Sequence, residues 1–597
     1  MKFSLRMLLS IPSSPQPTIQ LSLIEGGLTC IVLLAAFALP RTGAGLFQRI
    51  ERAFARVACR KNLSIAVVGG AAALLRLALL PLFPIPLPII PDEFSYLLAA
   101  NTFASGRLTN PTPAMWTHFE SIQISMTPTY MSMYFPGQGL VLALGKLLFG
   151  HPWFGLLLAT SLACAAICWM LQAWLPSRWA LLGGFIAVFH FALFSHWINT
   201  YIGSSSVSAL GGALVLGALP RLKRSLQTRD GLLLAAGIVI LALSRPYEGL
   251  LLCAPVAVAL SYWAFFGMNR PSLATLLRRS AAPVALLVFG ACWLAYYDYR
   301  LFENPFTLPY VLHRAQYAVA PTFVWQHLRP TPIYRHKAME EFYTRNEVIE
   351  FQKVRTLPGF FTGNLAKLAN CIYAYAGFAL LIPLLLVSRV FFDRRLRFLV
   401  LCMFILMAGM LAEAVLLPYY VAPFTAAFFA IGLQAMRHLR LWKPGGQPVG
   451  LAMLRGCVTL VIAMALVQVA GQIFRQGSPR MPNPAWSCDI DIPCACGTER
   501  ANIEAALASL PGKQLVLVRY SDHHRPLNEW VYNDPDIDAS RVIWAHDMDT
   551  AANRELINYY KDRTVWLVTP DVQPVEVAPY SASANAREWP DKAKTAD

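Results

Sequence analysis

Charged residues are scarce in this sequence. Only 14% of the 597 residues are charged, whereas 56% are hydrophobic. Charged residues make up about a quarter of an ordinary soluble protein, so the composition excludes a soluble globular chain of this length. We therefore expect the lipid bilayer to be the main solvent of most of the chain.

The twelve cysteines show no zinc-site spacing. Most stand singly in apolar segments, where cysteine behaves as a small hydrophobic residue. The cluster Cys488, Cys494 and Cys496 follows the last long apolar segment. An oxidising compartment would allow two of these three thiols to pair and would leave the third over.

Long apolar segments dominate the chain. About twenty such residues cross a hydrocarbon core of roughly 30 Å as a helix, and the sequence predicts about eleven or twelve spans. They lie near residues 21–40, 63–82, 152–174, 179–197, 201–220, 231–244, 249–267, 281–296, 371–391, 397–416, 419–436 and 449–471. The first contains Glu25 and has no clear small-residue cleavage site, which favours a span over a signal peptide.

The net charge of +17 is concentrated in short loops between apolar segments. Lysine and arginine collect on the cytoplasmic side of membrane proteins, so this charge indicates topology and not nucleic-acid binding. The five basic loops lie at 49–61, 221–229, 270–279, 389–397 and 437–443. All five are cytoplasmic if residues 137–150, too few for a full span, form a re-entrant or interfacial piece. Three polar stretches then lie on the opposite face: residues 83–136, 297–370 and everything after about 472.

The predicted fold is mainly α: a polytopic transmembrane helical bundle with a small C-terminal extracytoplasmic α/β domain. Three parts follow: an N-terminal segment at 1–62, a transmembrane domain at 63–471 and the α/β domain at 472–597. In the last part, hydrophobic periodicity predicts helices and strands in alternation. The helices are expected at 498–510 and 551–560, and the strands at 514–520, 541–545 and 564–569.

Asp92 and Glu93 form an acidic pair in the first outer loop, just beyond the span at 63–82. A carboxylate near a low-dielectric boundary resists ionisation, so its pKa moves toward that of a useful general base. The other interpretation is structural, because acids that follow a proline, here Pro91, also stabilise the first turn of a helix. The spacing by itself leaves both open.

This pair, with the proline-containing stretch from Tyr134 to Gln138, resembles the GT-C glycosyltransferases, a superfamily that includes protein O-mannosyltransferases and bacterial aminoarabinose transferases. The resemblance covers roughly residues 63–440 and is nearest to uncharacterised bacterial members. The family pattern often has lysine, proline and histidine where this chain has Met133, Phe135 and Tyr419, so no role is carried to those three positions.

The resemblance implies transfer of a sugar from a polyprenyl-phosphate-linked donor to an acceptor on the periplasmic face of the bacterial inner membrane, with inversion. The acceptor is an unidentified glycan, lipid or protein. In the family's pattern Asp92 would be the general base, and Glu93 would orient it or hold a metal. Tyr134 would contribute to substrate binding.

Arg245 and Glu248 interrupt an apolar stretch in the sequence Ser-Arg-Pro-Tyr-Glu-Gly. Charges in membrane segments are costly and usually functional, and a guanidinium suits the phosphate of a lipid donor. We therefore predict that both residues bind substrate. The other interpretation is that Arg245 pairs with Glu248 or extends to the lipid headgroups.

His118 and Glu120 follow Trp116 in the first outer loop and are predicted to join the site of Asp92. Such a carboxylate-rich set suits Mg²⁺ or Mn²⁺, although its spacing matches no metal motif. The cofactor prediction is therefore open: none is certain, and a divalent metal is possible.

Two further classes of function stay open. A transporter or flippase would place charges near mid-span and show paired discontinuous helices, whereas the polar residues here gather at one face and no repeat is visible. A non-catalytic envelope-assembly protein would use its C-terminal domain as a binding module, and Asp92 would then be dispensable. Fold class alone does not separate these possibilities.

Overall fold

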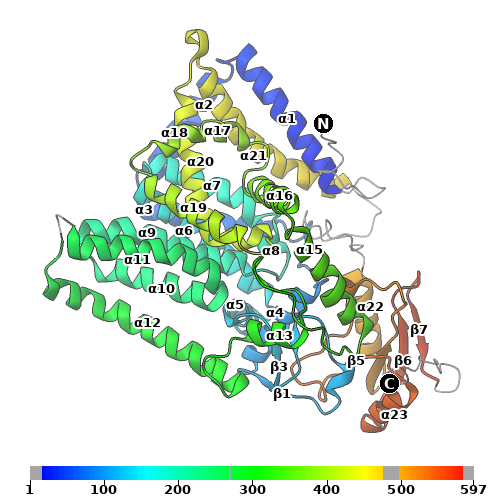
Figure 1. Cartoon of the computed structure of the whole chain (residues 1–597). Coiled ribbons are helices and arrows are strands. Elements are labelled where there is room, and N and C mark those ends of the chain that lie inside the picture. The colour runs from blue at the N-terminus through cyan, green and yellow to red at the C-terminus, as the bar shows by residue number, and fades with distance from the viewer. Residues whose placement is uncertain (1–16, 268–269, 475–495, 582–597) are drawn as a thin grey trace.

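The computed structural model describes residues 17–267, 270–474 and 496–581. Helices form a bundle, and the small sheet of the C-terminal region lies at one end of it (Figure 1). The predicted fold class is thereby confirmed. The pairing predicted among Cys488, Cys494 and Cys496 involves side chains that lie outside the described residues.

Eight of the described helices are long and apolar enough to cross a membrane, which makes the chain a multi-pass membrane protein. They are α1 (Pro17–Ala38), α3 (Lys61–Ala78), α6 (Trp153–Trp174), α9 (Ser205–Ser225), α11 (Pro246–Phe266), α12 (Leu273–Phe302), the continuous segment of η5 (Pro418–Phe424) and α20 (Thr425–Arg440), and α21 (Val449–Phe474). Each corresponds to a predicted span.

The other four predicted spans are shorter or interrupted. They are α7 (Ser177–Ala187) with the π-helical turn η3 (Val188–Ala192), α10 (Thr228–Ser244), α16 (Leu357–Ala376) followed by α17 (Leu381–Leu384) and α18 (Val387–Phe391), and α19 (Arg397–Leu411). The interruption after α16 falls at Gly377, which has a φ of 55°. There the Glu25 carboxylate on α1 accepts a hydrogen bond from the Ala379 amide at 3.2 Å. A polar group in α1 thus satisfies backbone that the broken helix leaves unpaired.

The bundle is organised around α6, which packs against α3, α7, α9 and α5 (Pro136–Phe149). Helix α5 has 14 residues, and its length agrees with the prediction that this segment is too short for a full span. It crosses α6 so closely that a Cβ on Gly145 would lie 2.0 Å from the Gly155 amide nitrogen. Small residues permit such close helix contacts in membranes.

The polar stretch at 83–136, the predicted first outer loop, is folded rather than irregular. It contains α4 (Pro91–Ala104) and an antiparallel sheet in the order β1 (Asn110–Pro111), β3 (Thr129–Ser132), β2 (Ile124–Ser125). The second outer loop contains the short helices α13 (Pro309–Tyr317), α14 (Lys337–Glu340) and α15 (Glu347–Lys353). The start of α4 agrees with the helix-start interpretation of the acidic pair, and the other elements were not predicted.

The C-terminal region contains α22 (Cys496–Ser509), β4 (Lys513–Val518), β5 (Val542–His546), α23 (Thr550–Tyr559), β6 (Arg563–Thr569) and β7 (Glu576–Pro579). The strand order is β5-β4-β6-β7, with β4 parallel to β5 and β6, and β7 antiparallel to β6. All five elements predicted here are confirmed. The edge strand β7 was not predicted, because its four residues are exposed and show no alternation of apolar side chains.

Candidate functional site

Asp92 lies in the first turn of α4, where Pro91 fixes the start of the helix. Its Oδ1 accepts a hydrogen bond of 2.5 Å from the Tyr134 hydroxyl, and the Tyr134 ring stacks on Tyr96 with centroids 4.4 Å apart. Burial raises the pKa of Asp92, while hydrogen bonds from Tyr134 and Gln123 and the charge of Arg245 oppose that rise. The helix-start interpretation is therefore correct, and the same residue is also a carboxyl group with a raised pKa.

Glu93 is buried, and its carboxylate is hydrogen-bonded to backbone amides. Its carboxylate accepts hydrogen bonds from the amides of Ile89 at 2.7 Å, Ile90 at 3.4 Å and Tyr201 at 3.0 Å. The pKa of Glu93 is raised to about 7. Burial is the largest cause and the charge of Asp92 adds to it, whereas the hydrogen bonds from the amides oppose the rise. Glu93 thus ties the start of α4 to the segment that precedes α9, and it is placed to position Asp92.

Hydrogen bonds already engage both acids of the pair. Glu93 directs its two oxygens at N–H donors, and one oxygen of Asp92 accepts from the Tyr134 hydroxyl. Among the residues that the structure describes, no group of three or more His, Cys, Asp and Glu side chains could hold a metal. The possible Mg²⁺ or Mn²⁺ therefore stays a prediction.

Arg245 connects α10 to α11 and is only 15% exposed in its side chain. Its Nε and Nη2 donate to the Gly203 carbonyl at 3.2 Å each, and its Nη1 pairs with Glu248 at 3.2 Å. The guanidinium carbon also lies 4.3 Å from the Tyr420 ring centroid and 5.1 Å from that of Tyr419. A guanidinium has five N–H groups, and the hydrogen bonds within the described residues use three of them.

The Gly203 turn places the tyrosines around Arg245. Gly203 has a φ of 78°, and a Cβ there would lie 2.5 Å from Cδ2 of Tyr419. Its carbonyl accepts both hydrogen bonds from Arg245. The close approach of backbone to ring therefore requires glycine at this position.

We expect Gly203→Ala to lower activity by about ten- to a hundredfold, because a small misplacement of a binding group is costly. The added Cβ would push Tyr419 away, and alanine would be strained in this left-handed backbone conformation. Gly445→Ala is the matched control: its φ is 56°, and a Cβ there would meet no atom within 4 Å. The turnover of both variants, at equal protein amounts, tests this prediction, and equal activities would contradict it.

Glu413 is a third acid near this site, and the sequence analysis missed it. It follows α19, is 7% exposed, and its backbone carbonyl accepts a hydrogen bond of 2.8 Å from Lys367. Its carboxylate is attracted by Arg245 and repelled by Glu248. A lone acid inside the apolar run 397–416 was the available signal, because such charges are rarely tolerated in a span without a role.

His118 and Glu120 contact residues within 317–335 and the C-terminal region. The His118 ring donates to the His546 carbonyl at 3.3 Å. Glu120 pairs with Arg335 at 3.3 Å and accepts a hydrogen bond from the Tyr317 hydroxyl at 3.0 Å. These contacts hold the outer loops against the C-terminal domain, and none of them is to Asp92.

The C-terminal domain also reaches α4 directly. Tyr532 stacks on Phe94 with ring centroids 3.9 Å apart and an interplanar angle of 5°. The Tyr130 hydroxyl in β3 donates to the Asn533 carbonyl at 2.9 Å. Phe94 stands two residues from Asp92, so the domain helps to fix the helix that carries the site.

Two histidines stack inside this junction. The rings of His336 and His546 lie 3.9 Å apart with an angle of 19°, and both residues are buried. Burial lowers the pKa of His336 well below its usual value and lowers that of His546 to about 3, while the carbonyls that accept from them oppose the shifts. The other titratable groups facing the stack are His118, His524, Glu120 and Glu529.

We expect acid to loosen this junction. A histidine exposed by undocking titrates near 6.5, whereas the docked histidines stay neutral to lower pH. Below about pH 6.5 the undocked state therefore binds more protons than the docked state. The free energy of docking falls by up to ~1.4 kcal/mol per pH unit and per histidine. Hydrogen exchange of the C-terminal domain at pH 7.5 and pH 5 measures this. His546→Gln should reduce the pH dependence, whereas the exposed His523→Gln should keep it; the same acid response in both would refute the assignment.

No family model and no curated protein matches this sequence. Among solved structures, ArnT from Cupriavidus metallidurans is similar to it at 14% identity over 84% of this chain and 92% of that one, with a TM-score of 0.46. ArnT bound to undecaprenyl phosphate gives 12% identity over the same shares and a TM-score of 0.44. The Archaeoglobus fulgidus oligosaccharyltransferase tethered to an acceptor peptide gives 14% identity over 84% and 68%, with a TM-score of 0.44.

These solved enzymes are GT-C glycosyltransferases, the superfamily that the sequence resembles. Likeness at this identity and TM-score concerns overall fold, and it says nothing about the reaction of this chain.

Proposed function

We propose that this chain is an integral membrane glycosyltransferase. It moves a sugar from a polyprenyl-phosphate-linked donor to an acceptor on the periplasmic face of the bacterial inner membrane, and Asp92 is its general base. The observation that carries the proposal is a carboxyl group with a raised pKa, hydrogen-bonded to Tyr134, with the charge of Arg245 close enough to act on it.

The reaction needs one proton acceptor and one anion binder. Asp92 takes the proton of the acceptor hydroxyl while that oxygen forms a bond to the anomeric carbon of the sugar. The bond between that carbon and the lipid phosphate breaks, and the phosphate leaves with the electron pair. Attack opposite the leaving group inverts the anomeric carbon. Stabilising the charge that develops on the phosphate is the larger task.

Arg245 is suited to bind the departing phosphate. Glu248, the Gly203 carbonyl and two tyrosine rings fix the guanidinium in place, so little reorganisation is needed when the anion forms. The residue stands between α10 and α11, where a lipid that stays in the membrane would present its headgroup.

The remaining site residues have supporting roles in this proposal. Tyr134 orients the Asp92 carboxyl group by its hydrogen bond. Glu93 fixes the start of α4 through three backbone amides. Glu248 keeps Arg245 charged and in position. The junction containing His118 and Glu120 holds the outer loops and the C-terminal domain over the site.

The experiment is a transfer assay on the full-length protein in sealed vesicles. Polyprenyl-phosphate-linked sugars labelled in the sugar are supplied with envelope extracts as acceptors, and products are identified by mass spectrometry. The proposal expects a new glycosidic bond and one free polyprenyl phosphate per sugar transferred. Labelled substrate that crosses the membrane unchanged would indicate a transporter, and no reaction or transport with any donor would favour an assembly protein.

A further inference from the structure

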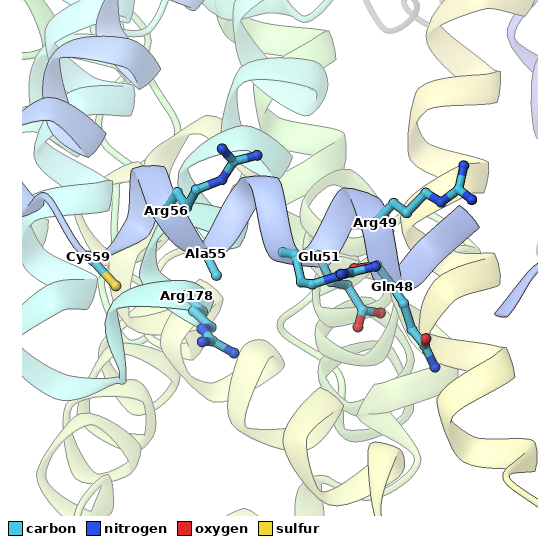
Figure 2. Close-up of a pocket in the computed structure, with 8 residues that line it drawn as sticks. Gln48, Arg49, Glu51, Ala55, Arg56, Cys59 and Arg178 are labelled. Atoms are coloured by element: carbon cyan, nitrogen blue, oxygen red, sulfur yellow. The ribbon is translucent and has the colours of Figure 1, made fainter. Parts of the chain in front are cut away.

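A separate basic pocket lies on the opposite, predicted cytoplasmic side of the chain. It has a volume of about 880 Å³ and is formed by α2 (Ala44–Ala58) and the first turn of α7. Its lining includes four arginines: Arg49, Arg52 and Arg56 from α2, and Arg178 from α7. Figure 2 shows Arg178 on the neighbouring helix, below Ala55 near the C-terminal end of α2, whereas Arg49 and Arg56 extend to the other side of α2 in this view.

The positive charge in this pocket is not neutralised by the protein. The acid in its lining, Glu51, is paired with Arg455 outside it, through hydrogen bonds of 2.9 and 3.0 Å. Among the described residues, no carboxylate forms an ion pair with any of the four arginines of the pocket. Four arginines from two helices therefore line one open pocket, and a bound anion would balance their charge.

Helix α2 has the form of a helix that lies on a membrane surface. Its polar face carries the three arginines, and its other face carries Leu46 and Ile50, which are 62% and 54% exposed. Exposed apolar side chains beside a basic face are typical of a helix at the boundary between headgroups and acyl chains. The pocket would then stand at the depth of the lipid phosphates.

We propose that this pocket binds the phosphate of an anionic phospholipid headgroup. Clusters of lysine and arginine next to a membrane segment attract anionic lipids, and a guanidinium fork matches the phosphate oxygens. The exposed Leu46 and Ile50 favour a lipid over a soluble phosphate, because they give the acyl chains an apolar surface next to the bound headgroup. The site is distinct from that of Asp92, and its occupancy does not depend on the reaction proposed above.

The test uses the full-length protein in nanodiscs of phosphatidylcholine with a minor share of phosphatidylglycerol. Native mass spectrometry measures how much phosphatidylglycerol each sample retains. The variant Arg52→Gln, Arg56→Gln, Arg178→Gln should retain about tenfold less than the unsubstituted protein, because it lacks three of the four guanidiniums that would hold the headgroup phosphate in this pocket. The control Arg278→Gln, Arg279→Gln removes two arginines outside the pocket lining and should retain the wild-type amount.

The same three positions changed to lysine keep the charge, and this variant should recover most of the retention. The melting temperature of each variant in pure phosphatidylcholine shows whether the fold is intact. Equal retention by the glutamine variant and the unsubstituted protein would overturn the proposal. Inorganic phosphate that binds the detergent-solubilised protein, without enrichment of phosphatidylglycerol, would also overturn it and indicate a soluble ligand.

Discussion

Replacement of Asp92 by asparagine should lower sugar transfer by about a hundred- to ten-thousandfold, the range that a general base contributes. Asparagine nearly preserves the shape of aspartate and can still accept a hydrogen bond from Tyr134, so the start of α4 should be unchanged. What is lost is the ability to take a proton from the acceptor. The measurement is the rate of glycosidic bond formation from a polyprenyl-phosphate-linked donor.

Two controls separate this effect from damage to the fold. Asp562→Asn removes an exposed carboxylate of the C-terminal domain that lies 3.9 Å from Lys513, and it should leave the rate unchanged. The pH profile is more specific: a base acts when deprotonated, so the wild-type rate should rise with pH through the pKa of Asp92, which burial places above its usual value. The asparagine variant should lack that limb, and undiminished turnover would exclude the mechanism.

Replacement of Arg245 should have the second large effect, a loss of transfer of about a hundred- to a thousandfold. In the single variant Arg245→Met, Glu248 stays buried without its cation, which costs about 3–5 kcal/mol of stability. A loss of activity in this variant alone would therefore not distinguish phosphate binding from a structural role.

The double variant Arg245→Met, Glu248→Gln makes that distinction. Removing both charges should restore most of the melting temperature, because no uncompensated charge is left in the protein interior. If Arg245 binds the leaving phosphate, transfer stays low in the double variant although the protein is stable. Recovery of transfer together with stability would show that Arg245 serves only to pair with Glu248.

The two alternatives that the sequence left open for Asp92 and Arg245 are not exclusive in the structure. Asp92 occupies the first turn of α4, as acids after a proline often do, and its pKa is also raised. Arg245 pairs with Glu248, and hydrogen bonds within the described residues leave two of its N–H groups unused. A structural contact fixes each group and thereby prepares it for a chemical role.

Hydrophobic runs and local periodicity determined most of the architecture. Eight predicted spans are long helices, and every helix and strand predicted in the C-terminal domain is present. These features depend on residues that are close in sequence. A span needs only a run of apolar side chains, and a strand needs only an alternation of apolar and polar side chains. The sequence likewise predicted Asp92 just after a span and put Glu248 three residues from Arg245.

Tertiary structure decided which of these residues meet. Tyr134 reaches Asp92 across 42 positions of the chain, and the tyrosine rings beside Arg245 come from a later helix. His118 contacts the C-terminal domain, and Glu120 pairs with Arg335, more than two hundred positions later in the chain. Such contacts depend on how whole helices pack. The Gly203 backbone, for example, lies so close to the Tyr419 ring that a single methyl group would not fit. No local pattern of residues predicts that arrangement.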